Sequence, residues 1–227
     1  RDMMHDDDYS TAFFSESERF FHNRMNGVLA QYNGKRDSYV EFVCDWEGMY
    51  STLSREKFRI LLAGRHYLDT FYYGFNYSMF HYAGQQGAPI ENVVDLQLLN
   101  PCVGVRFNAF FDFDIKLGAL LTAQRDRSFG HSWEKPCMGE FAFRISRWGL
   151  SLDERLYVGD NIHPFFYGHE LEDGTPLPYG RELYPAESFF RTDQKVYSRT
   201  ALSYRRSFFN DTVSVRAEFA AHHDGTA

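Results

Sequence analysis

The chain has 227 residues, a net charge of −7 and 18% aromatic residues, yet its mean hydropathy is −0.47. The acidic balance argues against a nucleic-acid partner, because phosphate binding needs a basic footprint. No run of about 18 apolar residues occurs, which excludes a transmembrane helix, so any insertion into a membrane must use strands.

The first 38 residues are the least regular part of the chain. Their opening, Arg1 to Asp8, has neither the basic region nor the apolar region of a signal peptide, as expected of an already processed or trimmed start. The pairs Phe13-Phe14 and Phe20-Phe21 are too apolar for a disordered tail. We therefore treat 1–38 as an N-terminal segment of uncertain structure and expect the β domain to cover 39–227.

From about Tyr39 onward, apolar and polar residues alternate with a period of two, which indicates strands whose two faces meet different surroundings. In the stretch 105–123, Val105 and Phe107 share one parity while Arg106 and Asn108 take the other. The same rule holds in segments around 57–65, 140–146 and 213–222. It is weaker in 39–50, 71–82, 150–158 and 196–206.

The predicted connections differ in length. Short turns are expected at 53–56, 112–114, 147–149 and 208–211, and longer links at 84–92, 125–136 and 160–194. Short periplasmic turns and longer outer loops are typical of outer-membrane barrels. Tyrosine, tryptophan and phenylalanine residues also fall near the predicted strand ends, where their rings would lie at the headgroup level.

These patterns predict an all-β fold, an antiparallel transmembrane β-barrel of about 10–12 strands. About nine strands are recognisable, and single-chain bacterial barrels have even numbers, so we expect that a final C-terminal strand is missing. Glu154 shares its parity with Leu152 and Leu156 and would face lipid, near an interface or at a bulge. The outside alternative is a soluble lipocalin-like barrel, which would place the aromatic parity inside.

Five short motifs follow one another along the chain: Val94-Asp95, Asn100-Pro101-Cys102-Val103-Gly104, Gln124-Arg125-Asp126-Arg127, Leu156-Tyr157-Val158-Gly159 and His222-His223-Asp224-Gly225. Together they resemble uncharacterised outer-membrane β-barrel proteins of Bacteroides-like Gram-negative bacteria, from about Tyr39 to the end. The resemblance implies a barrel fold, an outer-membrane location and a further strand after the last motif. It implies no mechanism.

Charged residues of both signs occupy the polar parity of successive strands. The wetted face of a soluble sandwich favours Lys, Thr and Ser, whereas ladders of paired charges suit a narrow polar lumen. We expect these side chains to line the lumen: Asp45, Glu47, Arg59, Arg65, Arg106, Lys116, Glu140, Arg144, Asp153, Arg155, Arg199, Arg205, Arg216 and Glu218.

Candidate sites outside the lumen are few. Arg125 and Arg127 begin an outer loop and could hold an anionic group such as a lipopolysaccharide phosphate, or they could pair internally with Asp126. Metal binding by His163, His169 and the acidic residues 170–173 is weaker than the alternative of solvated loop carboxylates. His222 and His223 would point to opposite faces, and the three cysteines are expected to be plain apolar fillers. We predict no catalytic residues and no metal site.

Two function classes stay open. The first is a narrow porin-like channel or uptake protein for small hydrophilic solutes, with loop 160–194 as a constriction. The second is a non-conducting structural or accessory barrel subunit of a cell-envelope complex, its lumen plugged by its own salt bridges. Neither is an enzyme or needs a cofactor. The expected partners are the lipid bilayer and lipopolysaccharide of a Gram-negative outer membrane, with other envelope proteins besides.

Overall fold

The computed structural model describes residues 4–5, 8–22, 24–88, 93–127, 130, 132–165, 183–191, 194–210 and 212–224. This part of the chain is almost entirely β. Its elements are α1 (Glu16–Phe21), β1 (Gly27–Asn33), β2 (Tyr39–Gly48), β3 (Lys57–Leu68), β4 (Phe71–Tyr82), β5 (Val94–Asn108), β6 (Asp112–Asp126), β7 (Cys137–Arg147), β8 (Leu150–Gly159), the 3-10 turn η2 (Ser188–Arg191), β9 (Val196–Phe208) and β10 (Val213–His223).

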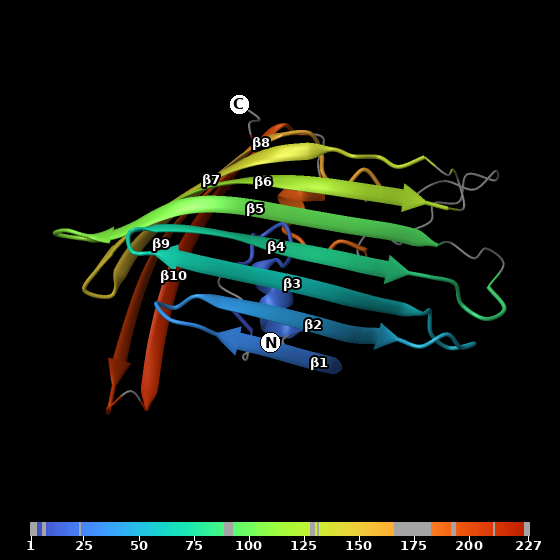
Figure 1. Ribbon diagram of the computed structural model, residues 1–227, viewed down its shortest axis with the longest axis horizontal. Helices are drawn as coiled ribbons and strands as arrows, with labels where there is room; N and C mark the ends of the chain where they lie inside the picture. The colour runs from blue at the N-terminus through green and yellow to red at the C-terminus, as the bar shows by residue number, and fades with distance from the viewer. Residues whose placement is uncertain are drawn as a thin grey trace.

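The ten strands form one antiparallel sheet in which each strand pairs with its neighbours in the sequence. β1 to β8 fan across the view, while β9 and β10 cross it at a steep angle (Figure 1). β1 and β10 are not paired with each other, so the described sheet is not closed. The predicted antiparallel all-β fold is confirmed; the finer prediction of a closed barrel goes beyond what this sheet contains.

Short turns gather at one end of the sheet and long links at the other (Figure 1). We call these the short-turn end and the long-link end. In the turn between β7 and β8, Trp148 and Gly149 both have positive φ, 54° and 83°, as a two-residue hairpin turn requires. Within the described residues, no helix is long and apolar enough to cross a membrane.

Several predicted turns were misplaced. Residues 53–56 belong to a longer link at the long-link end, and Asp112-Phe113-Asp114 opens β6, since the turn lies at 109–111. The tight turn at Asp69-Thr70 was not predicted. The errors at 112–114 and at Asp69-Thr70 share one cause: residue types that favour turns are a weak signal, while the strand pairs β5–β6 and β3–β4 extend their ladders until the chain must reverse.

Pro101 lies in the middle of β5, where a proline has no N–H to offer the ladder. The neighbouring Asn100 compensates, because its Nδ2 donates to the carbonyl oxygen of Ala119 on β6 at 3.0 Å. The strand therefore continues through the proline.

The two faces of the sheet differ as the alternation predicts. On β2, Val40 and Phe42 are exposed, while Glu41 and Val43 are buried. We call the side that carries the buried residues the inner face and the opposite side the outer face.

The inner face is covered by two other parts of the chain. The N-terminal segment 8–15 buries Tyr9, Phe13 and Phe14, and the segment 183–190 buries Phe189 and Phe190 in the same cluster. Residues of β2, β3 and β5 to β9 complete this core. The segment 1–38, which the sequence left unassigned, thus supplies both a filling for the interior and, with α1 and β1, two elements of the fold.

Candidate functional site

All fourteen charged side chains that we expected to line the lumen occupy inner-face positions of their strands. Several form ion pairs there: Arg59 with Glu47 at 3.3 Å, Arg106 with Asp114 at 3.2 Å, Lys116 with Glu140 at 3.0 Å, Arg144 with Asp153 at 2.8 Å and Arg199 with Glu218 at 2.7 Å. These side chains therefore share one face of the sheet with the buried core.

Glu140 on β7 is the centre of a buried network. Its carboxylate accepts hydrogen bonds from Asn100 Nδ2 at 2.9 Å, Lys116 Nζ at 3.0 Å and the hydroxyl of Tyr157 at 3.2 Å. The Tyr157 hydroxyl also lies 3.0 Å from Ser10 Oγ of the N-terminal segment. The network therefore joins strands β5 to β8 to the segment that fills the interior.

Glu41 on β2 is a second anchor, and sequence reasoning missed it. Although fully buried, its carboxylate accepts hydrogen bonds from the backbone N–H of His5 at 3.0 Å, Tyr9 Oη at 2.9 Å and Gln31 Nε2 at 2.9 Å. Its parity, shared with Asp45, was a signal that could have found it. The partners could not be foreseen, since they belong to the unassigned N-terminal segment.

The N-terminal segment also reaches β3 and β4. Asp8 pairs with Arg65 at 2.6 Å, and its carbonyl oxygen accepts a hydrogen bond from Asn76 Nδ2 at 2.9 Å. Phe14 lies under the guanidinium of Arg59, 5.6 Å from ring centroid to Cζ. Contacts to β2, β3, β4 and β8 place this segment across the inside of the curved sheet.

The segment 183–190 is held by Gln124 at the end of β6. The buried Tyr184 hydroxyl donates to Gln124 Oε1, and Gln124 Nε2 donates to the carbonyl oxygen of Ile162. Burial raises the pKa of Tyr184 well above its usual value, so the phenol stays protonated and able to donate.

Aromatic rings fix the rest of this segment. The rings of Phe189 and Tyr197 stack at 3.7 Å between centroids, and Phe190 meets Tyr157 edge-on at 5.1 Å. Buried rings of this size contribute much of the energy of a core. The segment is therefore packed as part of the interior rather than laid over it.

The interior is polarised along its length. The apolar clusters lie toward the long-link end, where Tyr82 and Val94 meet Leu183. Arginines and carboxylates concentrate toward the short-turn end, where two cavities of about 520 Å³ and 250 Å³ lie. The inner face, which the sequence suggested to be uniformly polar, thus carries most of its apolar core toward the long-link end and most of its arginines toward the short-turn end.

Arg125 and Arg127 pair with a partner that sequence reasoning did not name. Arg125 Nη2 lies 2.7 Å and Arg127 Nε 2.8 Å from the carboxylate of Asp95 on β5. This pairing raises the pKa of Arg127. Both guanidinium groups already hold an anion of the protein itself, so they are poor candidates for an external one, and Asp126 points to the other face.

The histidines form no metal cluster within the described residues. His163 is buried and stacks on Tyr184 at 4.0 Å between ring centroids, while His169 and the acidic residues 170–173 lie outside the described part of the chain. His222 hydrogen-bonds to Tyr197 on the inner face, and His223 takes the opposite parity.

The cysteines are unpaired. Cys102 is buried on the inner face, as an apolar filler would be, and Cys44 is half-buried. Cys137 is exposed on the outer face at the start of β7, so the expectation of a plain core filler does not hold there.

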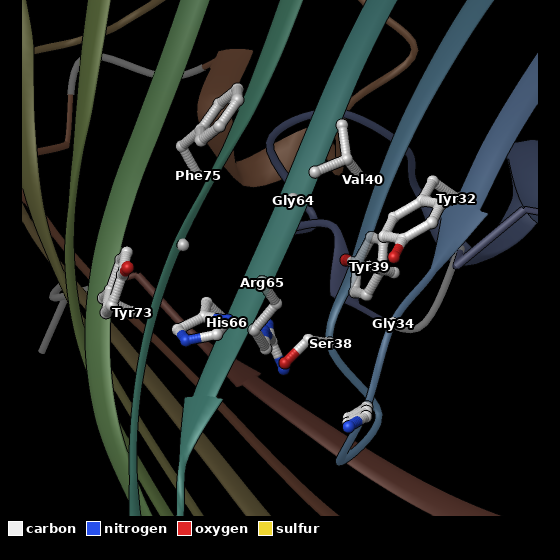
Figure 2. Close-up of a pocket in the computed structure, with 12 residues that line it drawn as sticks. Tyr32, Gly34, Ser38, Tyr39, Val40, Gly64, Arg65, His66, Tyr73 and Phe75 are labelled. Atoms are coloured by element: carbon white, nitrogen blue, oxygen red, sulfur yellow. The ribbon is translucent and has the colours of Figure 1, made fainter.

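The outer face carries an apolar groove of about 430 Å³ between β1 and β4. Figure 2 shows Val40, Tyr73 and Phe75 around the backbone of Gly64, with His66 nearer the short-turn end. A Cβ at Gly64 would approach the Tyr39 carbonyl oxygen to 3.3 Å. Because glycine has no side chain, the backbone of Gly64 forms the floor of the groove.

Comparisons of the chain with protein-family models, with curated proteins and with solved structures find no match.

Proposed function

We propose that this chain forms the wall of a Gram-negative outer-membrane β-barrel and serves as a non-conducting structural or accessory subunit of a cell-envelope assembly. The observation that carries this proposal is the apolar outer face: large apolar side chains point outward on adjacent strands across the sheet, while the buried charges share the inner face with the apolar core. A soluble lipocalin-like barrel would need a polar outer face.

The outer face supports the membrane part of the proposal. Phe75, Val103 and Leu117 are between 40% and 57% exposed, although they lie far from the strand ends. Apolar side chains repeated over adjacent strands cost free energy in water, and a bilayer removes that cost. Glu154, the one carboxylate expected on this face, hydrogen-bonds to Thr200 of the adjacent strand.

The filled interior supports the non-conducting part. A channel for small solutes needs a continuous aqueous path, whereas the half toward the long-link end is packed with the rings of Tyr9, Phe14 and Phe190. We therefore prefer the accessory subunit to the narrow channel. In this orientation the short turns face the periplasm.

The proposal is tested by extraction, gel mobility and conductance. We expect the protein to need detergent, to migrate differently before and after boiling, and to produce no conductance steps in a planar bilayer containing lipopolysaccharide. A protein that is monodisperse without detergent would contradict the membrane assignment. Steady conductance of the unaltered protein would instead favour the narrow channel over the non-conducting subunit.

A charge placed on the outer face provides a second test. In a bilayer, Val103→Arg at mid-strand should lower the free energy of unfolding by about 2–4 kcal/mol, because the guanidinium would face hydrocarbon. The matched change Val213→Arg, at the short-turn end of β10, should cost only about 0–1 kcal/mol near the interface. Urea unfolding in lipid vesicles measures both, and equal small costs would contradict a lipid-facing surface.

A further inference from the structure

The larger inner cavity, of about 520 Å³, lies at the short-turn end of β7 to β10. Its lining includes seven arginines and four carboxylates, an excess of three positive charges in a protein whose net charge is −7. The excess is therefore local and runs against the overall charge.

Three of the carboxylates in the cavity are already engaged by arginines. Asp153 pairs with Arg144 at 2.8 Å, and Glu218 accepts from Arg199 at 2.7 Å and also from Arg216. Glu16 of α1 lies 3.9 Å from Arg199. These contacts fix the positions of the guanidinium groups of Arg144, Arg199 and Arg216. Other N–H donors of the arginines in the lining are not used by these carboxylates.

The remaining donors are directed into the protein rather than into bulk water. Arg155 Nη1 and Arg199 Nε are buried and have no hydrogen-bond partner within the described part of the chain. Arg199 is only 5% exposed. On the same strand, Arg205 forms no ion pair with any described residue and lines the more open part of the cavity.

Arg155, Arg199 and Arg205 all line the cavity, where arginines outnumber carboxylates, and an oxyanion in the cavity would balance this excess of positive charge. Arginine forks match the paired oxygens of phosphate and carboxylate groups. We propose that this cavity binds a small anion with at least two oxyanion groups, one held by Arg155 and Arg199 in the interior and one by Arg205 nearer the opening.

This inference goes beyond the proposed function and does not depend on membrane insertion. Pyrophosphate, with two linked phosphate groups, is the first probe, and citrate is the second because it presents carboxylates instead. Titration calorimetry of the folded protein in detergent should detect pyrophosphate binding that weakens as the salt concentration rises. Binding of citrate as well would assign the site to oxyanions generally, and binding of pyrophosphate alone would assign it to phosphates.

Arg155→Gln and Arg205→Gln should each weaken pyrophosphate binding about tenfold or more, the loss expected for one charged hydrogen-bonding group. Arg206→Gln is the matched control, since it removes the same charge one residue away on the outer face. Arg205 is exposed, so its variant should fold even if Arg155→Gln does not, and circular dichroism of the strand content verifies folding. The proposal is overturned if the folded protein binds neither probe, or if Arg206→Gln weakens binding as much as Arg205→Gln.

Discussion

Replacing Glu140 by alanine should destabilise the protein by about 3–5 kcal/mol, the loss observed when one partner of a buried ion pair is removed. The carboxylate is fully buried and accepts from Asn100, Lys116 and Tyr157. Its removal leaves the Lys116 ammonium, only 12% exposed, without its counter-charge. Urea unfolding of the protein in detergent micelles measures the change in the free energy of unfolding.

The double variant Glu140→Met with Lys116→Met separates lost pairing from lost volume. Because an apolar pair of similar size can replace a buried ion pair at little cost, the double variant should be more stable than Glu140→Ala. If both variants lose the same free energy, the pairing with Lys116 is not what makes Glu140 important. A loss below about 1 kcal/mol in the single variant would place Glu140 in the range of solvent-exposed ion pairs.

Weakening the packing of the two segments that fill the interior, 8–15 and 183–190, should allow a protein that conducts no ions across a planar bilayer to conduct them. Phe14 anchors the N-terminal segment and Phe190 anchors the segment 183–190, and both rings are almost fully buried. Truncation of a buried phenylalanine to alanine costs about 3–5 kcal/mol, so the two truncations together remove a large part of the packing that holds these segments against the inner face. We expect conductance steps in planar bilayers from Phe14→Ala combined with Phe190→Ala.

Two controls make this result specific. The same pair of truncations on the outer face, Phe42→Ala with Phe75→Ala, should leave the bilayer silent, because these rings face away from the interior. Each variant must retain heat-modifiable mobility, which reports that the strands are still assembled. A folded interior variant that stays silent would mean that these rings do not block a path through the sheet.

The sequence determined strands β2 to β10 and the face of each of their side chains, because both follow from a period of two that is local to each strand. Arg106 and Arg144 could be assigned to one side of the sheet from their immediate neighbours alone. The two-residue turn at Trp148-Gly149 was equally local, since glycine adopts positive φ without strain. The unpredicted turn at Asp69-Thr70 shows the limit of such signals, for the chain reverses there without a glycine.

Tertiary structure decided the partners of those side chains and the contents of the interior. Arg125 stands opposite Asp95 in the β5–β6 register, while its sequence neighbour Asp126 points to the other face, so their pairing depends on the alignment of two strands. The N-terminal segment has no periodicity, and only the curved sheet gives Tyr9 and Phe14 a surface on which to be buried. Local periodicity thus determined which residues share a face, and packing between distant segments determined that the inner face is filled at one end and lined with arginines at the other.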